Sequence, residues 1–298
     1  MAWERWRRWL GSREPDGWPA VPRGRTEPRV RGFPPSANGA SSFHLRWLLD
    51  ERGAAPIRSA SVVLEVVDPP RVPRLHFWAL QVDVEDALGR RAGGAHLGLQ
   101  WHPEHPGSTA VNWGGYDQDG TVLHGSDSAL PSALHNPHTR DFGWVPCRPY
   151  RLKVEPAPAQ DQPDREHRGS VLTAWRGSLT DLTTGECTVV RDLHAWGDRI
   201  AGVIMWSEVF ARCDDPQVAV RWSDATVTGT DGRTRRPGSF RVNYQAPGDG
   251  GCANTTSQPD SGFRHDGGVV GTGQGGFGVL QVTNAERTTP QGAVIRNL

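Results

Sequence analysis

The chain has 298 residues, with 36 Gly, 24 Pro and a mean hydropathy of -0.56. Lys and Arg together number 33, as do Asp and Glu, so the formal net charge is zero. This balance excludes the strongly basic surface that nucleic-acid binding needs. No apolar run approaches the roughly 18 residues of a membrane-spanning helix. Frequent Gly and Pro without a collagen period favour turns and short strands over helices.

Residues 1–41 are expected to form an Arg-, Trp- and Pro-rich N-terminal arm and linker. Trp3, Trp6 and Leu10 have the spacing of a short amphipathic helix. Such a helix could cap the chain's own body, or residues 1–32 could bind a partner protein or lipid headgroups. Because arginines interrupt the apolar stretch, no signal peptide is predicted. A cytoplasmic location is therefore expected, with export by another route left open.

Alternating apolar and polar residues dominate residues 42–298, which are expected to form one domain. This period of two is typical of strands with one buried face. It occurs in seven segments, at 43–49, 62–67, 75–84, 96–101, 150–155, 218–222 and 240–244. Turn-forming pairs stand between strands, at Asp119-Gly120, Thr184-Gly185, Asp231-Gly232, Asp249-Gly250 and Asp266-Gly267. The pattern predicts an all-β fold: an antiparallel β-sandwich of jelly-roll or concanavalin-like type.

Several segments between about residues 75 and 290 support a resemblance to a known family. They are His96–Trp101, Val111–Tyr116, Tyr150–Val154, Trp206–Phe210, Asn243–Gln245 and Gly251–Thr255. Their order resembles that of a family of uncharacterised bacterial proteins with a concanavalin-like or jelly-roll sandwich. The resemblance implies a fold often attached to proteins that recognise or cleave glycans, and it supplies no reaction.

All four cysteines lie between residues 147 and 252, at Cys147, Cys187, Cys213 and Cys252. None forms the close pair of a zinc knuckle or a thioredoxin-like site. Their even number allows two disulfides, and the pairing expected is Cys147–Cys187 and Cys213–Cys252. The alternative is that all four are reduced, buried thiols.

A long polar insertion after residue 100 is the predicted binding region, because rim loops of a sandwich carry binding sites. Aromatic faces that stack on sugar rings, beside amides and charged groups that bond hydroxyls, predict a non-catalytic glycan-binding protein. The candidate ligand-binding residues are Trp101, His102, His105, Trp113, Tyr116, Asp117, Asp119, Asn136 and Arg140. The competing interpretation is that these Trp side chains fill the core and the polar groups satisfy one another.

No cofactor is predicted, and calcium is the metal considered. Asp117-Gln-Asp119-Gly120 is similar to the opening of a calcium loop, but no closing Glu follows at the required spacing. The same pattern is common in hairpin turns.

Two alternative functions remain open. In the first, the chain is a carbohydrate-active or small-molecule enzyme that uses acidic residues of the sandwich. Glu208 follows an apolar strand, where burial would raise its pKa, and Asp83 and Glu85 could share a strand face. In the second, the chain is an assembly component that docks on a partner through its N-terminal arm.

Overall fold

The computed structural model describes residues 29–36, 38–50, 53–163, 166–167, 170–260 and 278–296. These residues form strands and three single-turn 3-10 helices, at Pro106–Ser108, Ala159–Asp161 and Pro247–Asp249. Within the described ranges there is no α-helix, and no helix is long and apolar enough to cross a membrane. The predicted N-terminal helix (residues 1–10) lies outside the described residues, as does most of the arm.

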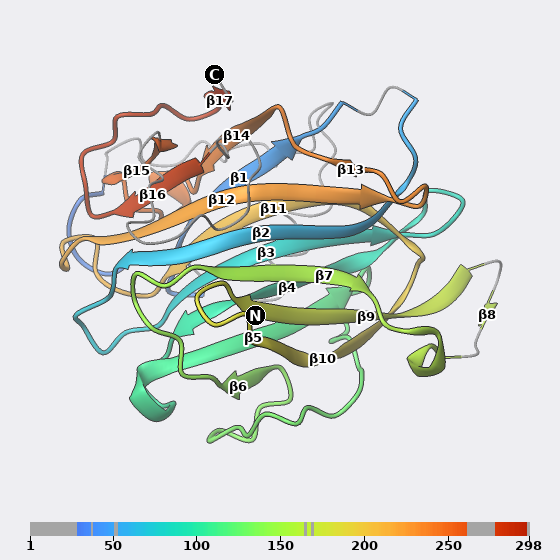
Figure 1. Cartoon of the computed structure of the whole chain (residues 1–298). Helices are drawn as coiled ribbons and strands as arrows, with labels where there is room; N and C mark the ends of the chain where they lie inside the picture. Colours follow the sequence, from blue (N-terminus) through green and yellow to red (C-terminus); the bar gives the residue numbers. More distant parts are fainter. Residues whose placement is uncertain are drawn as a thin grey trace.

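Two antiparallel layers make up the fold (Figure 1). The first layer has the order β6-β5-β4-β3-β11-β1-β14-β17. Its strands are β1 (Ser41–Leu48), β3 (His76–Glu85), β4 (Arg91–Trp101), β5 (Thr109–Asp117), β6 (Thr139–Asp141), β11 (Arg199–Val209), β14 (Ser239–Tyr244) and β17 (Val294–Arg296). Strands that are adjacent here come from distant parts of the chain, so the layer needs most of the sequence to form.

The second layer has the order β10-β9-β7-β2-β12-β16-β15, with β8 added beside β9 and β13 beside β12. Its strands are β2 (Ile57–Asp68), β7 (Tyr150–Pro156), β8 (Glu166–His167), β9 (Ser170–Asp181), β10 (Cys187–Trp196), β12 (Val218–Gly229), β13 (Thr234–Arg235), β15 (Thr255–Asp260) and β16 (Gly278–Thr283). One backbone pair, Ile200 with Ile57, links the two layers. The antiparallel β-sandwich predicted from the sequence is confirmed.

The core between the layers is built from the apolar members of the alternating segments. On β1, Phe43, Leu45 and Trp47 are buried, and the residues between them are only partly buried. Large side chains from both layers, Trp78, Trp113, Trp175 and Trp222 among them, are at most 1% exposed. Burial of this apolar surface is the main favourable term in the stability of the sandwich.

Glycine residues close the turns that the sequence predicts. Gly120, Gly185, Gly232 and Gly250 all have φ between 76° and 90°, a conformation that costs little only for residues without a Cβ. The fifth predicted turn, Asp266-Gly267, lies outside the described residues. These glycines fix where the neighbouring strands end.

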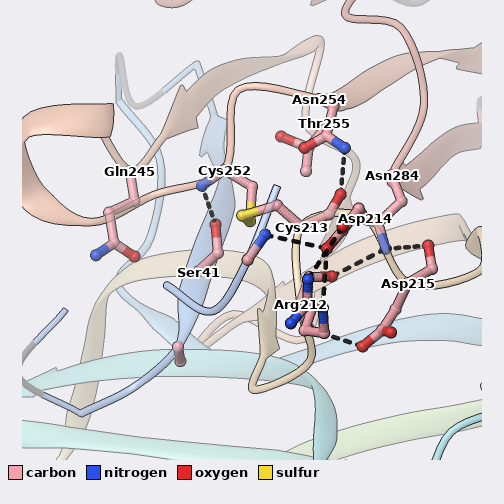
Figure 2. Close-up of a disulfide and its surroundings, with 12 residues drawn as sticks. Ser41, Arg212, Cys213, Asp214, Asp215, Gln245, Cys252, Asn254, Thr255 and Asn284 are labelled. Carbon is pink, nitrogen blue, oxygen red and sulfur yellow. Dashed lines mark hydrogen bonds and ion pairs between the residues drawn. A yellow bond between two sulfur atoms is a disulfide. The ribbon is translucent and has the colours of Figure 1, made fainter. Parts of the chain in front are cut away.

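Cys213 and Cys252 form a disulfide, with their Cα atoms 5.5 Å apart (Figure 2). Beside it, the amide of Cys252 donates to Ser41 Oγ at 2.8 Å, and Asn254 donates to the carbonyl of Cys213. The disulfide therefore holds the segments after β11 and before β15 next to the start of β1. The second predicted pair is wrong, because Cys147 and Cys187 are exposed free thiols.

Candidate functional site

The first layer has an outer face, opposite the core, and this face carries the candidate active site. Cross-strand register places Glu208 of β11, Phe77 of β3 and Gln100 of β4 in one row across it. Paired residues of an antiparallel sheet share a face, so all three side chains lie on the outer side. Ser42 of β1 continues the row beyond Glu208. Adjacent strands are spaced by about 4.8 Å, which puts Glu208 and Gln100 about 10 Å apart at their backbones.

The Glu208 side chain is partly exposed, and protein atoms surround the rest of it. Its Oε1 accepts a hydrogen bond from Asn38 Nδ2 at 2.6 Å, and Ser42 supplies a second hydrogen bond. Burial raises the pKa of Glu208 from its usual 4.5 to about 7, although both hydrogen bonds act to lower it. At neutral pH the protonated and ionised forms of this carboxyl are therefore both well populated.

An aromatic cluster lies beside Glu208 on the same face. The rings of Phe77 and Trp206 are 4.9 Å apart, and each contacts the ring of His96 at 5.6 Å. His44 also approaches Trp206, at 6.4 Å. Burial lowers the pKa of both His44 and His96 to about 3, so both rings are neutral at physiological pH. The surroundings of Glu208 are thus apolar and uncharged on this side.

Polar groups occupy the next part of the face along β3. Gln81 accepts a hydrogen bond from Trp206 Nε1 at 3.1 Å and donates one to Asp83 Oδ1 at 3.1 Å. Asp83 also forms an ion pair with Arg91 at 3.1 Å and lies against Gly94 and Gly202, where side chains would crowd it. Asp83 is six residues along β3 from Phe77, the partner of Glu208. The two carboxyls are consequently roughly 20 Å apart.

Glu85 lies at the far end of β3, where a register shift follows Val84. It pairs across the sheet with Arg91 and Arg199 rather than with a second carboxyl. The predicted acids Asp83 and Glu85 are therefore not brought together with Glu208.

Two of the predicted aromatic residues pack inside the protein. Trp113 is fully buried, and its Nε1 donates to the carbonyl of Trp175 at 3.1 Å. Trp101 is partly buried, donates to the carbonyl of Val72 at 3.1 Å and packs against the core. Trp113 has no face free for a ligand. Tyr116 differs, because it is only partly buried and lies near the outer face: burial and the charge of Glu208 both raise its pKa.

The predicted polar residues are spread over separate local structures. His105 is buried and bonds Asp141 through Nδ1 at 2.6 Å, with the ring of His102 4.7 Å away. Asp117 closes its own turn by accepting from the amides of Asp119 and Thr121 at 2.9 and 2.8 Å. Asn136 likewise accepts from the amide of His138 at 2.8 Å, and Arg140 lies on β6. No group of three or more His, Cys, Asp or Glu side chains comes together as a metal cluster in the described part of the chain.

Sequence reasoning identified Glu208 but missed the residues around it, namely Gln81, Gln100, His96, His44 and Trp206. A signal was present in residues 77–80, four apolar residues in a row that are buried on both faces of β3. A continuous apolar run indicates such a strand, whereas alternation indicates one solvated face. The run therefore indicates the part of β3 where side chains on the outer face of the first layer are buried as well.

Comparison with protein-family models and with curated proteins finds no match for this chain. Among solved structures, it is similar to SCP-B, a member of the eqolisin family of peptidases, in a complex with the tripeptide Ala-Ile-His. That match has 11% identity and a TM-score of 0.42, and it covers 81% of this chain and 97% of SCP-B. A second similar structure is scytalido-glutamic peptidase with a peptide-based transition state analog. There the identity is 10%, the TM-score 0.43, and the coverage 80% of this chain and 97% of the other.

These findings correct the function predicted from the sequence. The prediction of a non-catalytic glycan-binding protein is contradicted: the similar solved structures are peptidases, with 10–13% identity to this chain. The burial of Trp113 also removes one of the aromatic side chains that were expected to stack on a sugar. The β-sandwich itself is confirmed, whereas nothing supports the concanavalin-like family in particular.

Proposed function

We propose that this chain is a hydrolytic enzyme in which Glu208 transfers protons. The observation that supports this proposal is the combination of a raised pKa, about 7, with partial exposure of the Glu208 side chain. A general acid–base group works best when its pKa is near the working pH. The ionised carboxylate would take a proton from an attacking water, and the carboxylic acid so formed would give that proton to the leaving group.

Peptides and esters fit this site better than glycosides. Hydrolysis of a glycosidic bond generally uses two carboxyls about 5–10 Å apart, whereas Asp83 is roughly 20 Å from Glu208. Attack of water on an acyl carbon needs one acid–base group and a donor for the developing oxyanion. Gln100 lies in the same row as Glu208, and its side-chain amide nitrogen carries the N–H donors that an oxyanion needs. Its amide is the proposed group that bonds the acyl substrate.

The proposal is tested by comparing the full chain with its Glu208→Gln variant on fluorogenic peptides, p-nitrophenyl esters and p-nitrophenyl glycosides. Loss of a general acid–base group costs roughly 10²–10⁴-fold in rate, so kcat/KM of the variant should fall in that range on the substrates cleaved. The pH profile of the unmodified enzyme should show a group titrating near 7. Glu186→Gln, at an exposed acid, is the matched control and should retain full activity.

Two results would contradict the proposal. One is equal activity of Glu208→Gln and the unmodified chain on a substrate that both cleave. The other is absence of cleavage across all three substrate classes between pH 5 and 8.

A further inference from the structure

Four basic side chains meet at one edge of the sandwich. The connection between β5 and β6 runs beside β10, since the amide of His194 donates to the carbonyl of His124 at 2.8 Å. Arg191 of β10 reaches the same connection and donates to the carbonyl of Pro137 at 2.5 Å. His138 and Arg140 follow directly along the chain, with Arg140 on β6. We call Arg140, Arg191, His138 and His124 the edge cluster.

The positive charge of the edge cluster is poorly compensated. Neither Arg140 nor Arg191 forms an ion pair with any described residue. Asp127 and Asp192 act on Arg191 through space, and Asp141, which is bonded to His105, interacts with Arg140. Asp192 is already engaged, because both of its carboxylate oxygens accept hydrogen bonds from Arg176 at 2.9 Å. Asp127 is therefore the acid near Arg191 that forms no ion pair with another arginine of the described residues.

Arg191 is buried while part of its guanidinium has no partner. The residue is 6% exposed, and its Nε is a buried donor without an acceptor in the described part of the chain. Arg140 Nε and His138 Nδ1 are also buried and have no hydrogen-bond partner among the described residues. The pKa of Arg191 is lowered, first by burial and then by the positive charge of Arg140. The pKa of His138 is lowered in the same way, first by burial and then by the charge of Arg191. Buried donors normally have a partner, so these groups point to an acceptor that the chain does not supply.

We infer that the edge cluster binds a small oxyanion, a carboxylate or phosphate group, between Arg140 and Arg191. Guanidinium groups present planar, paired donors that match the oxygens of both anions. One bound anion would partner the buried Nε donors and relieve the repulsion between the two arginines. The inference does not rest on the proposed hydrolase activity, because Arg140 and Arg191 have no part in that proposal; His138 is the member of the edge cluster that lies next to His96.

Calorimetric titration of the full chain with inorganic phosphate, and separately with acetate, tests this inference at low ionic strength. We expect saturable binding of one anion per chain and a rise in Tm on its addition. The anion with the lower Kd identifies the ligand class. Arg140→Gln should weaken binding at least about tenfold, because charge-assisted hydrogen bonds contribute more than neutral ones.

The variant is expected to fold, because Arg140→Gln removes a like charge from beside Arg191. Its Tm without anion should equal or exceed that of the unmodified chain. Arg233→Gln, at a highly exposed arginine with 86% side-chain exposure, is the matched control and should bind as before. Arg140→Lys keeps the charge but not the paired donors, and should bind with intermediate affinity.

The inference is overturned if neither anion binds at millimolar concentrations, or if Arg233→Gln weakens binding as much as Arg140→Gln. Glu208→Gln should leave anion binding unchanged. Failure of the hydrolase proposal would therefore not affect this result, and failure of anion binding would not affect the hydrolase proposal.

Discussion

At the scale of single residues, the behaviour of Glu208 is set by its neighbours rather than by its own chemistry. The apolar rings of Phe77 and Trp206 and two neutral His side chains disfavour the carboxylate form. Hydrogen bonds from Asn38 and Ser42 favour it, but they are outweighed. The net pKa of about 7 makes this residue a pH-dependent element of stability as well as a candidate proton donor.

We expect Glu208 by itself to contribute a loss of stability as the pH rises from 4.5 to 7. The buried His44 and His96 contribute in the opposite direction, because their lowered pKa of about 3 makes folding more favourable up to about pH 6.5. The folded state holds the Glu208 proton up to about pH 7, whereas the unfolded chain loses it near 4.5, so folding is favoured at the lower pH. The loss should be on the order of 1–3 kcal/mol. Urea denaturation across this range measures it. Glu208→Gln lacks this loss, so the difference in stability between the two proteins should shift in favour of the variant from pH 4.5 to 7; the same pH dependence in both proteins would contradict the assignment.

At the scale of elements, the two layers are held in register where Trp113 of β5 packs on Gly177 of β9. A Cβ on Gly177 would lie 2.7 Å from Cγ of Trp113. Trp113 cannot move away freely, because it is fully buried and its Nε1 is bonded to the carbonyl of Trp175. This glycine is therefore required for close approach of the layers rather than for a turn.

Gly177→Ala should destabilise the fold by about 1–3 kcal/mol, the usual cost of inserting a methyl group into a packed core. The midpoint of urea denaturation, followed by tryptophan fluorescence, would report the change. Gly143→Ala is the matched control, since a Cβ there meets nothing within 4 Å. If the two variants had the same midpoint, Gly177 would not be the point of closest contact.

The strands themselves were largely predictable, and the reason is local. Alternation along residues 43–49 predicts which side of β1 is buried, because the side-chain period of a strand is two. Glycine turns at Gly120 and Gly185 were predictable for the same local reason. Strand neighbours were not: β11 lies between β3 and β1, and no periodicity in the sequence records that order.

At the scale of the whole molecule, the Cys213–Cys252 disulfide ties together the regions that follow β11 and precede β15. It closes a loop with a sequence separation of 39 residues. A cross-link of this length stabilises mainly by restricting the unfolded chain. It also makes the expected cytoplasmic localisation testable, because a reducing cytosol would keep both thiols reduced.

Replacing both Cys213 and Cys252 by Ser should lower the free energy of unfolding by roughly 2–4 kcal/mol. Thermal denaturation under non-reducing conditions would show the difference, and a reductant should bring the unmodified protein down to the same Tm. Cys187→Ser, at an exposed free thiol, is the control and should not change the Tm. Reductant-insensitive stability of the unmodified protein would show that the bond contributes nothing.

The sequence by itself determined that this protein is an antiparallel sandwich, which faces of its strands are buried, and that Glu208 is a candidate acid in an apolar neighbourhood. These features depend on residues close together in the chain, where periodicity and turn chemistry are readable. Only the tertiary structure decided that Trp113 is core, that Asp83 is far from Glu208, and that Arg191 bonds the connection that leads into Arg140. Each of those facts depends on pairing between distant strands, which fixes distances that local patterns do not encode.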